Sequence, residues 1–331
     1  MNSNNEELKI KNVVVAGGGI LGSQIAYQTA YCGFDVTILI RKEDSLEEVN
    51  KKLQKLHKTY LETIDIMDTK AGKNNWANGI ASVDNFNKNE CIKKAENALK
   101  NIKIETDQRE ALKNADLLVE SITENINIKK SFYEGISNLM PDKTIVVTNS
   151  STLLPSKLAN YTGREEKYLA LHFANSIWKN NISEVMKHSN TDDKYFYEIV
   201  NFAKHINMIP LEVREEKSGY LLNSLLVPFL LCAMDLLANG TSDVETIDKS
   251  WTLGTGAPKG PFQIIDVVGL ETAKNIVTQY QKVPDLLDPL FKKMMLPYNY
   301  DGMLKILNEY IEAGKLGKSV GEGFYKYNDN E

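Results

Sequence analysis

Short apolar runs alternate with longer amphipathic stretches over the first two thirds of the chain. Runs rich in β-branched and aliphatic residues predict strands, at 13–16, 36–40, 102–104, 117–120, 144–148 and 168–173. The stretches between them predict helices, most clearly at 20–31, 44–63 and 126–140. Strands that alternate with helices are typical of βαβ units on a parallel sheet. The first part of the chain is therefore predicted to have an α/β fold.

The pattern changes after about residue 210, where long helical stretches replace the alternation. These stretches lie at 220–238, 243–253, 260–280 and 303–313. We therefore predict two domains, an α/β domain over 1–210 and an all-α domain over 211–331, with the junction at 210–215.

The helical stretch 220–238 is apolar on most sides and nearly long enough to span a bilayer. Asn223, Pro228 and Asp235 interrupt it, and an Asp or Asn inside a membrane would need a polar partner. We therefore interpret the stretch as a helix buried in a core or a subunit interface, and we expect no membrane span.

Composition and charge narrow the class of protein. The 331 residues carry a formal net charge of −5 without an evident basic face, so nucleic acid is not expected as a partner. Cys32, Cys91 and Cys232 lack metal-ligand spacing, which suits free thiols in a reducing compartment and predicts no metal site. The first ten residues lack the basic start and apolar run of a secretory signal. We therefore expect a cytoplasmic protein.

The residues GGGILG at 17–22 match the G-x-G-x-x-G pattern between a predicted strand and a predicted helix. Gly17 permits the tight turn, Gly19 lets the backbone approach a pyrophosphate, and Gly22 lets helix and strand pack closely. The N–H groups at the helix start, at Ile20 and Leu21, would face the phosphates. A glycine cluster also occurs in ordinary turns, but this context favours a dinucleotide site and a Rossmann-type domain.

The acidic residue that usually ends the second strand of such a domain is absent. Ile40 stands where a ribose-binding carboxylate is expected, and Arg41 and Lys42 follow. A carboxylate there selects the 2′-hydroxyl of NAD, whereas an arginine suits the 2′-phosphate of NADP. Arg41 and Lys42 are equally well explained as solvated turn residues, and Glu43 or Asp44 would also be within reach of the ribose. The cofactor is therefore predicted to be NAD or NADP.

Seven segments together resemble the 3-hydroxyacyl-CoA dehydrogenase family, in particular short bacterial 3-hydroxybutyryl-CoA dehydrogenases. They are spread over nearly the whole chain, in the order and at the spacings of that family. The segments are VVAGGGILGSQIA (14–26), ADLLVESITEN (115–125), TNSSTL (148–153), LHFAN (171–175), LLNSLLVPFL (221–230), PKGPFQIIDVVGLE (258–271) and GKSVGEGFYKY (317–327).

The resemblance implies four catalytic residues. His172 would take the proton from the substrate's 3-hydroxyl while hydride moves to the nicotinamide, and Glu184 would be its carboxylate partner. Ser151 and Asn223 would polarise the substrate oxygen. Histidine is well matched to reversible proton transfer near neutral pH, and a carboxylate on its other nitrogen fixes the tautomer. Ser151 as a helix cap, Asn223 as a core amide and Glu184 as a surface carboxylate are the structural alternatives.

The resemblance also implies cofactor contacts. Glu124 and Lys129 match positions on the nicotinamide side, and Asn149 begins the family's Asn-Thr-Ser-Ser signature. The other histidines of the chain lie in polar stretches, so surface roles are expected for them: His57, His188 and His205.

Three positions depart from the family pattern. Ser176 stands where a proline usually stiffens the loop, and Ser224 stands where an arginine usually follows the helix asparagine. These two leave the shape and chain length of the substrate open. Ile40 replaces the acidic ribose ligand, which leaves the choice of cofactor open.

The resemblance therefore implies an NAD(P)-dependent enzyme that interconverts short-chain 3-hydroxyacyl-CoA and 3-ketoacyl-CoA, as a homodimer formed through the helical domain. The lysines of 51–58 are candidates for the CoA phosphates, although such a run is also typical of a solvated helix face: Lys51, Lys52, Lys55 and Lys58. Two alternatives are a related dehydrogenase for a CoA-free 3-hydroxy acid or sugar acid, and a non-catalytic, crystallin-like dinucleotide-binding protein.

Overall fold

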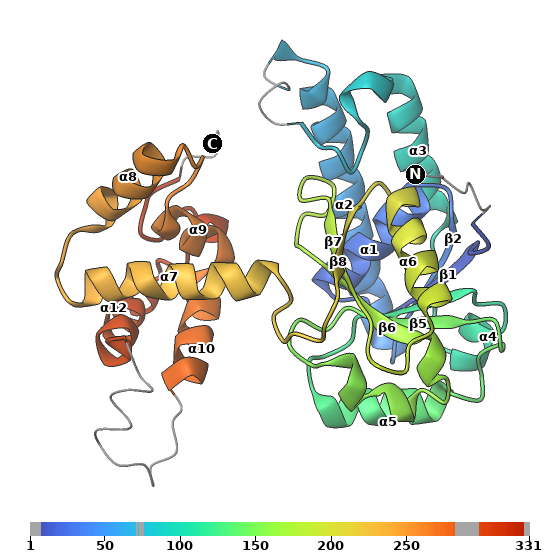
Figure 1. The fold of residues 1–331 in the computed structure, drawn as a ribbon. Helices are drawn as coiled ribbons and strands as arrows, with labels where there is room; N and C mark the ends of the chain where they lie inside the picture. The colour runs from blue at the N-terminus through green and yellow to red at the C-terminus, as the bar shows by residue number, and fades with distance from the viewer. Residues whose placement is uncertain (1–7, 71, 73–75, 282–297, 328–331) are drawn as a thin grey trace, which may run out of the picture. The chain divides into compact units, whose positions relative to one another are not determined.

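The computed structural model describes residues 8–70, 72, 76–281 and 298–327. By its internal contacts the chain divides into two compact units, Met1–Leu221 and Leu222–Glu331 (Figure 1). The residues before position 8, on which the expectation of no secretory signal partly rests, lie outside the described residues.

The first unit is built on a sheet whose described strands follow the order β3-β2-β1-β4-β5-β6-β7-β8. Every neighbouring pair is parallel except β6 and β7, which are antiparallel. The strands are β1 Asn12–Ala16, β2 Asp35–Leu39, β3 Lys103–Glu105, β4 Leu117–Glu120, β5 Ile145–Thr148, β6 Tyr168–Phe173, β7 Ile182–Met186 and β8 Ile209–Val213. The first six follow the Rossmann order, which confirms the predicted fold.

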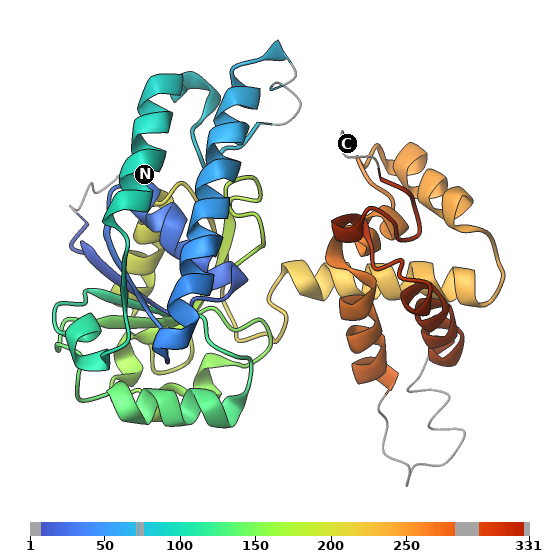
Figure 2. The same cartoon turned by 180° about the vertical axis from the view of Figure 1, so that it is seen from behind.

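Helices cover both faces of this sheet, because its strands are apolar on both sides. In β1, Val13 and Val15 join one core with residues of α1, α2, α3 and α6, whereas Val14 and Ala16 join a second core with α4 and α5. The helices are α1 Ile20–Tyr31, α2 Leu46–Met67, α3 Lys88–Asn101, α4 Gln108–Leu112, α5 Ile126–Ile136 and α6 Asp193–His205. The long helices α2 and α3 run side by side (Figure 2).

The end of the sheet differs from the prediction, which contained neither β7, α6 nor β8. Pro210 lies within β8, and proline is tolerated there because β8 is an edge strand. The predicted junction at 210–215 falls within β8 and just after it. Because β8 pairs with β7, the sheet continues through that segment, and the first unit ends at Leu221.

Helix α5 ends at Ile136, not at 140 as predicted. Beyond it, the Arg164 guanidinium donates hydrogen bonds to the carbonyls of Pro141 (2.7 Å) and Ser137 (3.0 Å). Pro141 has no N–H group to donate to the Ser137 carbonyl in a longer helix, and the guanidinium supplies that donor instead.

The second unit consists mainly of helices around one core. They are α7 Leu222–Ala238, α8 Val244–Thr255, α9 Pro261–Val268, α10 Leu270–Gln281 and α12 Tyr300–Glu312. The stretch 260–280 was predicted as one helix and is two, because Gly269 adopts a left-handed φ of 93° between them. Within the described residues, no helix is both long and apolar enough to cross a membrane.

The segment 317–327 closes this unit around a buried carboxylate. Asp266 accepts hydrogen bonds from Phe324 N (2.8 Å), Tyr325 N (2.9 Å) and the Tyr327 hydroxyl (2.9 Å). A Cβ at Gly323 would lie 2.1 Å from Asp266 Oδ1, so this position requires glycine. The motif at 317–327, which carries part of the family resemblance, is therefore explained by its packing around Asp266.

Candidate active site

The glycine turn between β1 and α1 has the contacts that its sequence pattern predicts. Gly17 has a φ of +113°, and a Cβ there would lie 2.4 Å from the carbonyl oxygen of Ser121. A Cβ at Gly22 would lie 2.1 Å from the carbonyl oxygen of Gly17. Both positions exclude a side chain, because the turn and the helix approach each other too closely.

The N-terminus of α1 is open beside Gly19. A Cβ at Gly19 would meet no atom within 4 Å, and the residue caps the helix without a side-chain hydrogen bond. The backbone bond from Ser23 N to Gly19 O (3.0 Å) begins the helical ladder, so the N–H groups of Ile20 and Leu21 lack a partner within the helix. Free N–H groups at the positive end of a helix dipole fit the pyrophosphate of a dinucleotide.

A cavity of about 890 Å³ lies beside this turn. It is lined by Gly18 and Gly19 of the turn, by Ile40 and Arg41 after β2, and by the segment 121–123 after β4. The carboxyl ends of β1, β2 and β4 therefore meet at a crevice, the usual ligand position in an open α/β sheet.

A histidine and a carboxylate face each other where the sheet turns antiparallel. His172 on β6 and Glu184 on β7 are directly paired in the register. His172 Nδ1 lies 3.0 Å from Glu184 Oε2, and His172 Nε2 lies 3.2 Å from Ser151 Oγ. His172 and Glu184 are 7% and 1% exposed. Because opposed residues of antiparallel strands share a face, the twelve-residue spacing places these two side chains in contact.

The chain just before α7 supports this pair. The backbone N–H of Leu221 donates to the second oxygen of Glu184 (2.8 Å), and the Tyr220 ring stacks on the His172 imidazole at 4.6 Å and 11°. Burial, followed by nearby glutamate charges, raises the pKa of the Tyr220 hydroxyl, which donates to Ser150 O at 2.7 Å. The sequence pattern contained no signal for Tyr220, because the stacking depends on tertiary structure.

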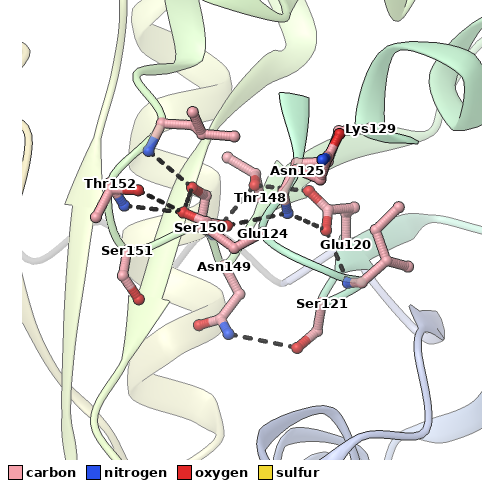
Figure 3. A network of polar contacts seen from close by, with 12 residues as sticks. Glu120, Ser121, Glu124, Asn125, Lys129, Thr148, Asn149, Ser150, Ser151 and Thr152 are labelled. Atoms are coloured by element: carbon pink, nitrogen blue, oxygen red, sulfur yellow. Dashed lines mark hydrogen bonds and ion pairs between the residues drawn. The ribbon is translucent and has the colours of Figure 1, made fainter. Parts of the chain in front are cut away.

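Lys129 lies within a buried network of polar side chains near the end of β4 (Figure 3). Its Nζ is 2.5 Å from Glu120 Oε1 and 3.5 Å from Glu124 Oε2, and the side chain is 1% exposed. Glu120 also accepts hydrogen bonds from the Tyr133 hydroxyl (3.0 Å) and the Thr148 hydroxyl (2.8 Å). A buried ion pair needs such additional partners to offset its desolvation. Glu120 is not among the residues predicted for the site, although a carboxylate that ends an apolar strand is a usable signal.

Glu124 holds the turn that carries Ser151. One carboxylate oxygen accepts from Ser150 Oγ (2.5 Å), Thr152 N (3.0 Å) and Thr152 Oγ1 (2.9 Å). Burial alone would raise the pKa of Glu124, but these hydrogen bonds and the Lys129 charge bring it below its ordinary value. Ser150 Oγ accepts from Leu153 N (2.9 Å), so Ser150 makes the local backbone contact while Ser151 contacts the histidine.

The remaining expected site residues lie in different places. Asn149 accepts a hydrogen bond from Phe173 N (3.0 Å) and donates to Ser121 Oγ (3.4 Å), so it joins β5 to the strand of His172. Asn223 lies in the first turn of α7, in the second unit, and is half-buried. The structure thus brings Ser151, His172 and Glu184 together within the first unit.

The lysines of α2 were candidates for the CoA phosphates. Lys51, Lys52 and Lys58 each pair with a glutamate four positions away on α2, at 2.6, 2.7 and 3.7 Å, which favours a solvated helix face over a CoA clasp.

His188 was expected at the surface and is 4% exposed, with Nε2 3.2 Å from the carbonyl oxygen of Glu165. Its polar sequence neighbours concealed this burial.

Ser176, in the loop after β6, occupies a conformation that proline cannot adopt. Its φ is 58°, and its backbone N–H donates to the buried Gln24 Oε1 at 2.8 Å. Proline fixes φ near −65° and has no N–H group. At this position, where the family usually has proline, the loop is held by the hydrogen bond from Ser176 to Gln24 of α1.

Ser176→Pro is expected to lower the free energy of unfolding by about 2 kcal/mol or more, since it loses the bond to Gln24 and strains the backbone. The matched control is Ser176→Gly, which tolerates the positive φ and is expected to stay within about 1 kcal/mol of the original chain. Denaturant titration measures both. Equal destabilisation by the two variants would contradict this account of the loop.

An open helix N-terminus beside a crevice, with a histidine–carboxylate pair on neighbouring strands of the same sheet, defines a class of protein. It is a dinucleotide-dependent oxidoreductase, in which the first unit holds both the cavity beside the glycine turn and the histidine–carboxylate pair.

Comparisons with known proteins give the particular family. Residues 12–216 match the model of the 3-hydroxyacyl-CoA dehydrogenase NAD binding domain, and residues 219–327 match that of the C-terminal domain. The chain belongs to the 3-hydroxyacyl-CoA dehydrogenase family. It is 31% identical over 322 residues to the mitochondrial hydroxyacyl-coenzyme A dehydrogenase of Homo sapiens, covering 97% of this chain and 93% of that protein.

The names of two further relatives describe different substrates. The 3-hydroxybutyryl-CoA dehydrogenase of Clostridioides difficile is 28% identical over 96% of this chain and 99% of its own length. A solved diketoreductase, described as acting on dicarbonyl compounds, is 43% identical with a TM-score of 0.79, covering 96% of this chain and 99% of that chain.

Proposed function

We propose that this enzyme interconverts short-chain 3-hydroxyacyl-CoA and 3-ketoacyl-CoA with NAD(P), and that His172 is its general base and acid. The observation that carries the proposal is the position of His172, with Glu184 on one ring nitrogen (3.0 Å) and Ser151 on the other (3.2 Å). Glu184 thereby orients the ring, and the nitrogen beside Ser151 is the one that would accept the proton of a substrate hydroxyl.

A nicotinamide dinucleotide, when bound, would supply the acceptor or donor of hydride for carbon 3 of the substrate. His172 Nε2 takes the proton of the 3-hydroxyl as hydride leaves, so that the ketone forms without a protonated intermediate. Glu184 accepts the Nδ1 proton and stabilises the imidazolium that results. Ser151 and Asn223 donate hydrogen bonds to the substrate oxygen, where negative charge develops during reduction.

The cofactor contacts follow from the same arrangement. The open N–H groups of the glycine turn bind the pyrophosphate. We assign Glu124 to the nicotinamide side from the family resemblance, and Asn149 to a further cofactor contact. Hydrogen bonds and the Lys129 charge lower the pKa of Glu124. Lys129 is 1% exposed, so it acts by holding Glu120 and Glu124 in place.

We further propose a cytoplasmic homodimer that binds an acyl-CoA substrate. The second unit exposes large apolar side chains, among them Leu225 (75%) on α7 and Leu253 (83%) on α8. Exposed apolar residues of this size are typical of protein interfaces. Cys32, Cys91 and Cys232 are unpaired, which suits a reducing compartment.

A CoA-free dicarbonyl substrate is the second candidate. The diketoreductase that is 43% identical to this chain supports it, as do the α2 lysines that are already paired with glutamates. The two candidates share the chemistry of His172 and differ only in whether the CoA moiety supplies binding energy.

The comparison of acetoacetyl-CoA with free acetoacetate separates the two. We expect kcat/KM for acetoacetyl-CoA to exceed that for acetoacetate by about a hundredfold or more, because binding energy from a remote part of a substrate lowers the barrier. The measurement is the loss of nicotinamide absorbance under matched conditions. Equal values of kcat/KM, or a preference for the free acid, would favour the CoA-free alternative.

A further inference from the structure

The cavity beside the glycine turn is lined by two cationic side chains and one carboxylate at the end next to strand β2. Ile40 and Arg41 line it there, and Ser45, Glu48 and Lys52 line it from the start of α2. In a dinucleotide-binding domain this end of the cavity receives the adenosine ribose, because it adjoins the end of β2. The side chains at this end decide whether the ribose carries a 2′-hydroxyl or a 2′-phosphate.

The acidic residues that follow β2 do not line this cavity. Glu43 and Asp44 border an adjoining hollow of about 500 Å³, together with Glu105 at the end of β3. Neither is among the residues that line the larger cavity, although the two hollows share Thr106. Of the charged residues 41–44, Arg41 is the one that lines the larger cavity.

Among the described residues that line the cavity, Glu48 is the one carboxylate, and it has a cationic partner. Glu48 pairs with Lys52 at 2.7 Å, and Lys52 also donates to the carbonyl oxygen of Gly18 at 3.1 Å. The Lys52 hydrogen bond holds the pKa of Glu48 below its ordinary value. The Lys52 charge therefore offsets the repulsion between Glu48 and an anion in the cavity.

Arg41 and Ser45 both have unused hydrogen-bonding capacity at this end. Within the described part of the chain, the Arg41 guanidinium has neither an ion pair nor a hydrogen bond, and Ser45 caps α2 without a side-chain bond. A guanidinium is a planar donor that matches a phosphate bidentately, and a hydroxyl adds one further donor. A phosphate monoester carries about −1.5 to −2 charges near neutral pH.

We propose that this end of the cavity binds the 2′-phosphate of NADP(H), and that Arg41 makes the enzyme selective for NADPH over NADH. Ile40, which replaces the carboxylate that would repel a phosphate, and the hydroxyl of Ser45 complete the subsite. The inference rests on the proposed dinucleotide function, and it adds the identity of the cofactor.

Binding measurements on the full chain test this inference without turnover. Titration of nicotinamide fluorescence gives Kd for NADPH and NADH, and displacement by 2′,5′-ADP or 5′-AMP isolates the phosphate from the nicotinamide. We expect NADPH to bind at least about tenfold more tightly than NADH, and 2′,5′-ADP to displace it at least about tenfold better than 5′-AMP.

Arg41→Ala is expected to raise Kd for NADPH by about tenfold to a hundredfold and to change Kd for NADH by less than about twofold. The matched control is Lys42→Ala, which removes an exposed neighbouring cation that does not line the cavity and is expected to change neither value. Equal or tighter binding of NADH, or equal weakening of both dinucleotides by Arg41→Ala, would overturn this inference alone. Failure of both dinucleotides to bind would overturn it together with the proposed function.

Discussion

His172→Gln is expected to lower kcat for reduction of acetoacetyl-CoA by about 10²- to 10⁴-fold and to leave dinucleotide affinity nearly unchanged. Glutamine can still form hydrogen bonds with Glu184 and Ser151, so the local packing is preserved. It cannot give or take a proton near neutral pH, so hydride transfer loses its acid–base partner. Steady-state kinetics and fluorescence titration measure the two quantities separately.

The matched control is His205→Gln, an exposed histidine on α6 whose Nδ1 lies 2.9 Å from the carbonyl oxygen of Asn201. We expect its kcat to stay within about twofold of the original chain, as for most surface substitutions. A His172→Gln variant with normal turnover would remove His172 from the mechanism.

Glu184→Gln is expected to be the second most damaging change, with kcat lowered by about 10²-fold or more. Glu184 accepts hydrogen bonds from His172 and from Leu221 N on different oxygens. The amide of glutamine offers one acceptor, so keeping the Leu221 bond turns its NH₂ group toward His172 Nδ1. That nitrogen then becomes the acceptor, and the proton moves to Nε2, which can no longer serve as the base.

Ser183→Ala is the control for this variant, because Ser183 precedes Glu184 on β7 and its buried hydroxyl has no hydrogen-bond partner within the described residues. We expect Ser183→Ala to retain turnover within about twofold. If Glu184→Gln also retained full kcat while the fold was intact, the carboxylate would have only a structural role.

The fold could be predicted from sequence where apolar pattern and secondary structure coincide. The strands 117–120 and 168–173 and the helix 20–31 are at their predicted residues, because each is a continuous buried run or follows a turn signal. Strand β7 was missed for the opposite reason, since ISEVM contains Ser183 and Glu184, both of which are buried. A strand with polar residues facing the interior gives neither an alternating nor a continuous apolar pattern.

In the candidate site, likewise, features set by neighbouring residues could be predicted from the sequence, whereas contacts between distant segments could not. The glycine turn is a local motif, and its geometry follows from residues 17–22. The contact of His172 with Glu184 depends on the register of β6 and β7, for which the sequence offered only the family resemblance. The contribution of Tyr220 and the position of Glu43 and Asp44 arise from packing between distant segments, so no pattern within the sequence could have predicted them.

The central claim is that this chain reduces a 3-ketoacyl-CoA through His172. The most direct measurement is the formation of 3-hydroxybutyryl-CoA, detected by chromatography, from acetoacetyl-CoA and a stoichiometric amount of NADPH or NADH. We predict one product molecule for each dinucleotide oxidised by the original chain, and a rate lowered by about 10²-fold or more in His172→Gln with the dinucleotide still bound. The claim would be contradicted by dinucleotide binding without product, or by product formed at the same rate in both proteins.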